Sequence, residues 1–165
     1  MNRMDMTPEK EKQYREALEE SVTLGYKILK EGGTSQEAVE HSIRVMENSP
    51  LFNAGKGAVL TAEKTIELDA AFMNGKDLNA GAVASVKTIK NPITAAIKVM
   101  EESPHVLLSA RGAEKFAKEK DLEIVDPSYF FTERRVNDLD KIKSIESSAN
   151  RSKKQVDKEF ISMQR

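Results

Sequence analysis

Cysteine and tryptophan are absent from the 165 residues of this chain, and aromatic residues make up only 5%. Without cysteine the chain has no disulfide, no thiolate metal site and no cysteine nucleophile. This composition fits a reducing compartment, and we therefore expect a cytoplasmic protein. Because aromatic side chains are so few, the hydrophobic core must consist mainly of aliphatic residues and alanine.

Long hydrophobic runs and an excess of charge of one sign are also missing. No stretch reaches the roughly 18 consecutive apolar residues of a membrane-spanning helix. The N-terminal sequence MNRMDMTPEKEKQ has no apolar segment of the kind found in signal peptides. Lysine and arginine number 26 against 27 acidic residues, which gives a net charge of −1. We therefore expect one domain, or a large part of one, with no membrane or nucleic-acid partner.

The first 50 residues carry the signals of two helices. Thr7-Pro8 is typical of a helix N-terminus, and apolar residues then recur with a period near 3.6 until Gly32-Gly33. Thr34 and Glu37 form a capping box that opens a second helix. Pro50 ends that second helix.

Beyond Pro50 the apolar period changes to two, which predicts strands. We expect a short strand at residues 57–60 and a longer one at 65–73. Asn74-Gly75 predicts a tight hairpin turn, because both residues tolerate positive φ. The return strand at residues 78–86, LNAGAVASV, contains mostly small residues, which indicates burial on both faces.

The remaining sequence predicts further helices and no repeating strand–helix pattern, so the expected fold class is α+β. Residues 1–137 are expected to form the folded domain and residues 138–165 a polar linker or disordered tail, with fraying from Ser144 onward. The elements expected after the hairpin are a helix at 91–100, a short strand at 106–108, a helix at 110–119, a short strand at 122–125 and a last helix from Thr132 to about Ile142.

Three groups of residues invite a chemical role, but none forms a complete catalytic set. The Gly-Lys-Gly sequence at residues 55–57 is too short for a phosphate-binding loop. Glu67 and Asp69 project from one strand face, where they could do acid–base work or bind a cation, although a solvated, salt-bridged face is the favoured interpretation. His41 and His105 have no partner at metal-ligand spacing.

Five sequence motifs together resemble the N-terminal half of the plant-type L-asparaginase/isoaspartyl peptidase family. They lie in the family's order between Pro50 and Ala117, and weaker similarity extends over about residues 7–135. The resemblance implies the four-layer αββα fold of N-terminal nucleophile hydrolases, of which this chain would form the α-subunit half without the opening strand and the β half. The motifs are PLFNAGKGAV, ELDAAFMNG, LNAGAVASV, NPITAA and SPHVLLSARGAEKFA.

Family members cut themselves before a threonine, whose hydroxyl then attacks the side-chain amide of L-asparagine or the isopeptide bond of β-aspartyl peptides, with its own α-amino group as the base. The resemblance implies that a separate β subunit supplies this threonine, in a heterodimer that pairs into a dimer of heterodimers. None of the threonines of this chain lies in a cleavage context, and the chain alone is expected to be inactive. The alternatives are a truncated, inactive relic or protein-interaction module, and, less favoured, a self-contained hydrolase that uses Glu67 and Asp69.

The resemblance also assigns site residues. Asn53 matches a family asparagine that lies close to the nucleophile and helps to orient it; the alternative is a turn residue that stabilises its own loop. Positions on both sides of Asn53 match a family loop that holds a structural Na⁺ through main-chain carbonyl oxygens. Binding through main-chain atoms tolerates any side chain at these positions. No other cofactor is expected. The sodium-loop residues are Met46, Glu47, Ser49, Phe52, Ala54 and Lys56.

Overall fold

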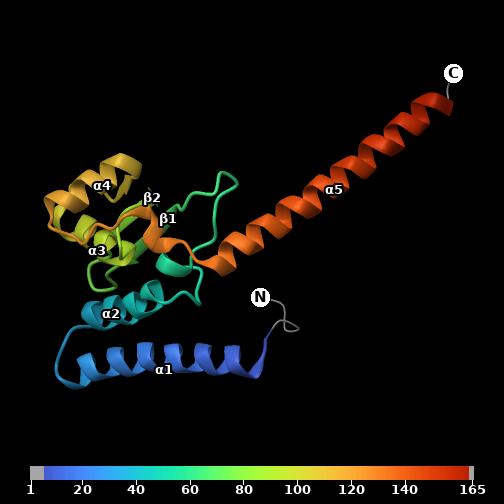
Figure 1. Cartoon of the computed structure of the whole chain (residues 1–165). Coiled ribbons are helices and arrows are strands. Elements are labelled where there is room, and N and C mark those ends of the chain that lie inside the picture. Colours follow the sequence, from blue (N-terminus) through green and yellow to red (C-terminus); the bar gives the residue numbers. More distant parts are fainter. Residues whose placement is uncertain (1–5, 164–165) are drawn as a thin grey trace.

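The computed structural model describes residues 6–163, and the side chains of residues 6–148 (Figure 1). The α-helices are α1 (Pro8–Lys30), α2 (Ser35–Asn48), α3 (Pro92–Glu102), α4 (Ala110–Glu119) and α5 (Glu133–Met163). The strands are β1 (Leu68–Met73), β2 (Ala80–Val86) and β3 (Leu107–Ser109), and short 3-10 helices are η2 (Gly55–Gly57) and η3 (Pro127–Phe130). The expected α+β class is therefore confirmed.

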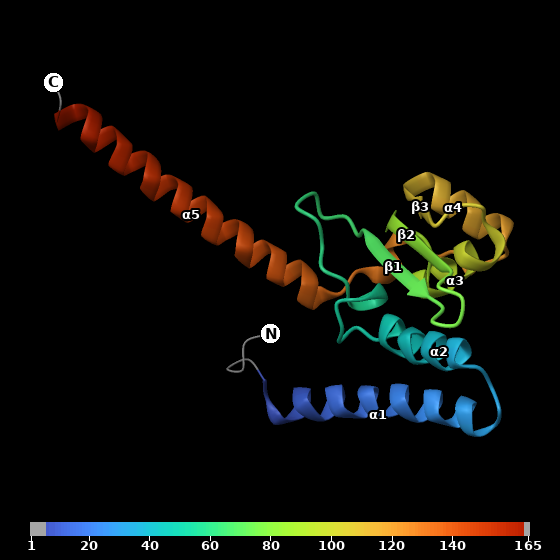
Figure 2. The same ribbon diagram turned by 180° about the vertical axis from the view of Figure 1, so that it is seen from behind.

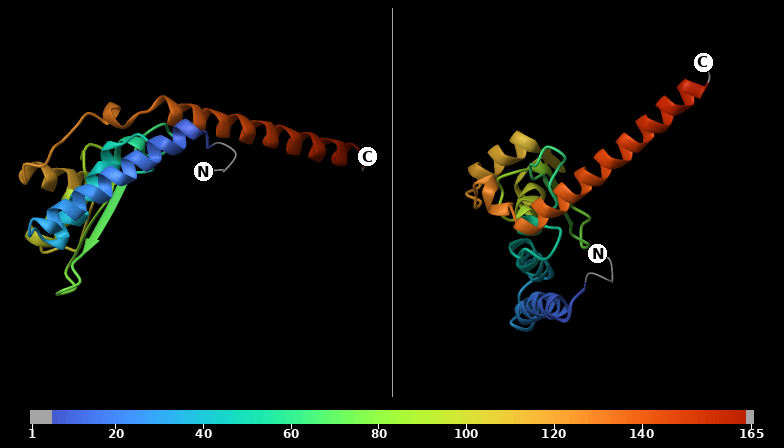
Figure 3. Two further views of the ribbon diagram at one scale, coloured as in Figure 1. Left: turned by 90° about the horizontal axis from the view of Figure 1, so that it is seen from below. Right: turned by 45° about the vertical axis from the view of Figure 1, so that its right-hand side comes forward.

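Helices α1 and α2 form an antiparallel pair, and α2 lies between α1 and the rest of the molecule (Figure 3). The predicted caps are present: Thr7 accepts from the Lys10 amide, and the Thr34–Glu37 capping box is complete. The two helices approach closely at Gly25, where an added Cβ would lie 2.5 Å from the Ser42 hydroxyl oxygen. An added side chain would displace the Ser42 hydroxyl, which donates to the Ser21 carbonyl, so glycine favours this close contact.

The three strands form one sheet in the order β1-β2-β3. Strands β1 and β2 are antiparallel, whereas β2 and β3 are parallel and joined by α3. Helix α3 packs on this sheet so closely that a Cβ on Gly81 would collide with the backbone of Ala96 and Met100. The core forms around this contact and is aliphatic except for Phe130, with Val83, Val86, Ala95, Val99, Ala113 and Ala117 among its members.

The opposite face of the sheet has no helix over it among the described residues. In Figure 2, β1 and β2 lie in front of α3. Met73 is 60% exposed and Leu107 is 56% exposed. Ala82 of β2 lies opposite Ala71 of β1 on one side and opposite Leu107 of β3 on the other. We call this surface, made of Ala71, Met73, Ala80, Ala82 and Leu107, the open face. The prediction that β2 is buried on both faces is therefore wrong for the described residues.

Two strands expected from the sequence are not formed. Gly57 ends the 3-10 turn η2, and residues 58–60 run on as irregular chain. The Gly57 amide donates to the Ala54 carbonyl and its carbonyl accepts from Arg135, so neither group pairs with a strand. Residues 122–125 contribute only an isolated bridge between Ile89 and Ile124. The helix at 110–119 and the strand near 107, by contrast, are confirmed.

The hairpin between β1 and β2 is longer than a two-residue turn. The amide of Asn74 donates to the Asn79 carbonyl at 2.8 Å, and the Asn74 side chain accepts from the Lys76 amide at 3.0 Å. The left-handed residue is Leu78, with φ 62°, and not Asn74 or Gly75. The Asn74 side chain thus favours a wider turn by bonding its own backbone.

The last helix does not end near Ile142, and residues from Ser144 onward do not form the expected frayed linker. Helix α5 continues to Met163 and projects away from the body (Figures 1 and 3). The sequence from Glu133 to Met163 contains no glycine or proline, so nothing in it interrupts a helix. The Thr132 cap is confirmed, since its hydroxyl accepts from the Arg135 amide at 3.4 Å. The boundary between residues 137 and 138 stays a prediction.

Candidate functional site

Asn53 lies in the loop that connects α2 to β1, at the centre of the strongest sequence motif. Its Oδ1 accepts a hydrogen bond of 2.8 Å from the Val59 amide, which closes the loop on itself. The residue is exposed, and it lines two cavities, one toward the first turns of α5 and one toward the start of β1. The side chain thus stabilises its own loop and at the same time lies at the surface, and its Nδ2 has no hydrogen-bond partner among the described residues.

The loop backbone around Asn53 is tightly coiled. Gly55 has φ 48° and lies against the carbonyl group of Glu47, so that an added Cβ would collide with it. Gly57 lies in the same way against the carbonyl oxygen of Phe52. Both glycines therefore permit the backbone to approach itself, and neither position forms a phosphate-binding turn.

The residues of the predicted sodium loop supply carbonyl oxygens of the kind that hard cations prefer. The carbonyls of Glu47 and Phe52 are turned toward the two glycines, while those of Met46 and Ala54 accept amide hydrogen bonds from Ser49 and Gly57 and keep a second lone pair. The Lys56 ammonium group lies over the Tyr129 ring, 5.3 Å from its centroid. The loop is compatible with a carbonyl-bound cation, which stays a prediction.

The side chain of Glu47 has a role that sequence reasoning missed. It is only 4% exposed, and it accepts hydrogen bonds of 3.0 Å from the Ile93 amide and from the Asn91 side chain. It thereby connects the end of α2 to the first turn of α3. Burial raises the pKa of Glu47 to about 7, although these two hydrogen bonds oppose the shift. Nothing in the sequence at the end of this helix indicated that the Glu47 side chain would be buried.

Glu67 and Asp69 have structural partners, as the favoured interpretation expected. Glu67 forms an ion pair of 3.1 Å with Lys87. Asp69 lies at a bulge between β1 and β2 and accepts a hydrogen bond of 2.7 Å from the amide of Ser85, which has φ 53°. Asp69 therefore stabilises a strained backbone position, and neither carboxylate is arranged as an acid–base pair.

The two histidines form only local hydrogen bonds among those found within the described residues. His41 Nδ1 lies 2.9 Å from the Glu37 carbonyl oxygen within its own helix, and the His105 amide donates to the Ser103 hydroxyl at 3.0 Å. No group of three or more histidine, aspartate or glutamate side chains within the described residues is arranged to hold a metal ion. The described part of the chain likewise contains no helix long and apolar enough to cross a membrane.

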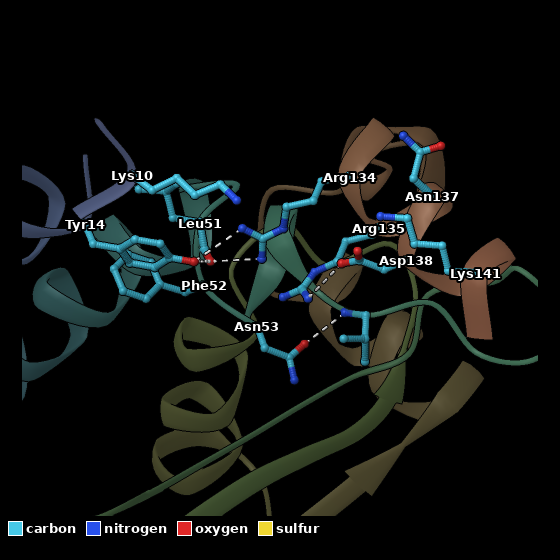
Figure 4. Close-up of a pocket in the computed structure, with 11 residues that line it drawn as sticks. Lys10, Tyr14, Leu51, Phe52, Asn53, Arg134, Arg135, Asn137, Asp138 and Lys141 are labelled. Carbon is cyan, nitrogen blue, oxygen red and sulfur yellow. Dashed lines mark hydrogen bonds and ion pairs between the residues drawn. The ribbon is translucent and has the colours of Figure 1, made fainter. Parts of the chain in front are cut away.

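A larger cavity of about 820 Å³ opens beside Asn53, between α1, the loop and the first turns of α5 (Figure 4). The Tyr14 hydroxyl donates to the Leu51 carbonyl at 2.6 Å, and Arg134 approaches both groups at 3.3 and 3.4 Å. Arg135 Nε donates to the Gly57 carbonyl at 2.7 Å. Sequence reasoning did not identify Tyr14 or the two arginines, because they come from segments more than a hundred residues apart.

Comparison with known proteins places this fold and loop in a family. A family model described as asparaginase (Asparaginase_2) matches residues 1–164. The chain is 46% identical over 136 residues to the isoaspartyl peptidase/L-asparaginase of Mus musculus, which covers 82% of this chain and 42% of the mouse protein. It is 45% identical over 139 residues to the isoaspartyl peptidase of Escherichia coli strain K12, covering 84% and 43%. It is 50% identical over 113 residues to the plant-type L-asparaginase of Pyrococcus abyssi, covering 68% and 37%.

The chain therefore belongs to the asparaginase family that this model represents. Within that family, its relatives include isoaspartyl peptidases and plant-type L-asparaginases, as the sequence motifs indicated. The chain spans about two fifths of the length of the curated relatives it matches. Its mixed α+β architecture is compatible with part of an N-terminal nucleophile hydrolase fold.

Proposed function

We propose that this chain is the α-subunit portion of an isoaspartyl peptidase/L-asparaginase, which hydrolyses the side-chain amide of L-asparagine or β-aspartyl peptides. The observation that carries the proposal is the family match over residues 1–164, together with identities of 45–50% to relatives named for these activities. In this proposal a second segment supplies the nucleophilic threonine that the reaction requires. We call that segment the β subunit.

The open face supports the need for this partner. Its side chains are small or apolar, and a sheet surface of this kind is normally covered by another layer. A β subunit that places a second sheet there would complete the four-layer αββα fold. The assembly is then a heterodimer, and by resemblance to the family a dimer of heterodimers.

In this proposal Asn53 acts through its Nδ2 group. Its Oδ1 is held by the Val59 amide, which fixes the orientation of the whole amide group. The remaining N–H groups then face the surface, where they can donate to the threonine hydroxyl oxygen of the partner and orient it. The threonine's own α-amino group serves as the base, so this chain supplies positioning rather than a proton acceptor.

The test is to assemble the chain with the β subunit of a relative and to measure ammonia release from L-asparagine and dipeptide cleavage. We expect Asn53→Ala to lower kcat by about 10-fold or more while the pair still assembles. The matched control is Asn79→Ala, an exposed asparagine in the hairpin, which should leave the rate unchanged. If Asn53→Ala and Asn79→Ala behave alike, Asn53 does not belong to the site.

The alternatives predict different results in the same assay. An inactive relic or interaction module would bind the partner without any turnover. A self-contained hydrolase would be active without a partner, and Asp69→Asn would abolish that activity. The ion pair of Glu67 and the bulge contact of Asp69 argue against the second alternative.

We also propose that the loop holds a structural Na⁺ through the main-chain carbonyls of Met46, Glu47, Ser49, Phe52, Ala54 and Lys56. The tightly coiled backbone at Gly55 and Gly57 supports this assignment, because it gathers carbonyl groups in one place. We expect the midpoint of thermal unfolding to be higher in NaCl than in an equal concentration of tetramethylammonium chloride, and Gly55→Ala to remove the difference. An equal midpoint in both salts would contradict the cation site.

A further inference from the structure

The cavity beside Asn53 carries an excess of positive charge that the proposed reaction does not use. We call it the basic groove. Arg134, Arg135 and Lys141 of α5 line one side and Lys10 of α1 lines the other, and Asp138 is the one acidic side chain among the lining residues. Figure 4 shows the two guanidinium groups side by side above Asn53.

The two arginines are incompletely compensated by negative charge. Arg134 reaches only neutral oxygens, those of Tyr14 and Leu51, at 3.3 and 3.4 Å. The side chain of Arg135 is 13% exposed, and its ion pair with Asp138 is long, at 3.9 Å. Burial and the neighbouring charge of Arg134 lower the pKa of Arg135. Adjacent like charges of this kind favour the binding of an anion between or beside them.

A purely structural role explains only part of this arrangement. The hydrogen bond from Arg135 to the Gly57 carbonyl attaches α5 to the loop and needs just one N–H group. It does not account for Lys141, whose carbonyl oxygen accepts from the Ser144 hydroxyl at 2.7 Å but whose ammonium group forms no hydrogen bond or ion pair with the described residues. Nor does it account for a cavity of about 820 Å³ at this place, a volume within the range of small-molecule sites.

We propose that the basic groove binds a small molecule that bears a carboxylate, with Arg134 and Lys141 contacting the negative charge. The guanidinium group of Arg134 offers the planar pair of donors that suits a carboxylate. L-Aspartate is the natural probe, a choice that rests on the proposed function, because hydrolysis of the L-asparagine amide releases it. The groove shares the wall formed by Asn53 with the proposed reaction site, so a bound product would lie next to that site.

The test is titration of the full chain, without any β subunit, with L-aspartate at about 20 mM ionic strength, followed by calorimetry or NMR. We expect saturable binding with a Kd on the order of 1 mM. Lys141→Gln and Arg134→Gln should each weaken it by about 5-fold or more, since each removes a charge-assisted contact. Arg111→Gln and Lys118→Gln on the distant α4 are matched controls that should leave the Kd unchanged.

A second variant separates binding from folding. Arg134→Lys keeps the positive charge but loses the planar pair of donors, so it should weaken binding while circular dichroism and the unfolding midpoint stay as in the wild type. Lys141→Gln removes no side-chain hydrogen bond or ion pair with the described residues and keeps the main-chain contact to Ser144, so it serves the same purpose. Binding unaffected by Lys141→Gln and Arg134→Lys would overturn the proposal, as would the absence of saturable binding. Tighter binding of inorganic phosphate than of L-aspartate would overturn the carboxylate assignment.

This experiment and the activity assay fail independently. Binding of L-aspartate by the chain alone requires no nucleophile, so it would stand even if the assembled pair had no activity. Conversely, if the assembled pair is active but the α-subunit portion does not bind L-aspartate, the proposed function stands and the basic groove is excluded as a carboxylate-binding site.

Discussion

The two faces of the three-stranded sheet differ sharply although the same strands build both. On one face, Gly81 and Val83 pack against α3 so closely that the backbones of strand and helix nearly touch. On the other, Ala71 and Met73 are exposed among small residues. The covered face holds the core of this chain, whereas the open face has the composition of a core without the layer that would complete it.

This difference shows that the small side chains of β2 have two separate explanations. Gly81 is small because α3 leaves no room for a Cβ. Ala82, its neighbour in sequence, points the other way and meets no helix among the described residues, so its size does not serve the packing of this chain. We attribute it to the approach of a partner sheet, which makes the open face the surface on which the proposed assembly depends.

The largest expected effect on stability comes from introducing a leucine on each face of the sheet in turn. Gly81→Leu forces a side chain into the backbone of Ala96 and Met100, so we expect loss of the cooperative unfolding transition in urea. Ala82→Leu, one residue away, should leave the stability of the chain within about 0.5 kcal/mol and weaken assembly with the β subunit. Equal destabilisation by both substitutions would show that the open face is packed within this chain.

A smaller effect concerns Glu47, which anchors α3 over the covered face. Because its pKa is raised to about 7 from the usual 4.5 of a glutamate side chain, the folded state binds a proton between these pH values that the unfolded state has released. Its contribution to stability is therefore fully present below about pH 4.5 and is lost as the pH rises to about 7. We expect the loss to be about 3 kcal/mol at most.

Urea unfolding at a series of pH values checks this sign. Glu47→Gln cannot ionise, so the difference in free energy of unfolding between the wild type and this variant should shift in favour of the variant from pH 5 to pH 7.5. Glu119→Gln, an exposed helical glutamate, is the control and should show no such shift. A wild type that gains stability relative to Glu47→Gln over this range would contradict the raised pKa.

The smallest effect on the chain itself is expected on the open face. Met73→Asp replaces a side chain that is 60% exposed, so the free energy of unfolding should change by no more than about 0.5 kcal/mol. The same charge should strongly reduce assembly with the β subunit, because it would be buried in the interface without a partner. Sedimentation of the mixture measures the effect on assembly. If the Met73→Asp chain assembles with the β subunit as the wild type does, Met73 does not lie in the interface.

Much of the fold was predictable because its signals are local. The Thr7 and Thr34 caps, the proline that opens α3 and the alternation through Leu68 and Phe72 each depend on a few neighbouring residues. The errors have two different causes. Gly57 at the start of the expected strand 57–60 is held by contacts with Phe52 and Arg135, which the local sequence does not reveal. Beyond Ser144 the polar composition suggested a tail, although the segment contains no glycine or proline and continues the helix.

The candidate site was predictable only in part, because distant contacts decide its geometry. Asn53 was identified through the motif that contains it, but the hydrogen bond from Val59 is a matter of loop geometry. The burial of the Glu47 side chain depends on Asn91 and Ile93, more than forty residues away. The basic groove joins Tyr14 to Arg134 across 120 positions, a distance over which sequence periodicity carries no information.

The most direct measurement is the rate of L-asparagine hydrolysis by the chain alone, by a β subunit alone and by the two mixed. The account predicts turnover only in the mixture, and its loss when Met73→Asp prevents assembly. Turnover by the chain alone, or a stably assembled pair with no turnover at all, would contradict the claim that this sheet is one half of an amidohydrolase.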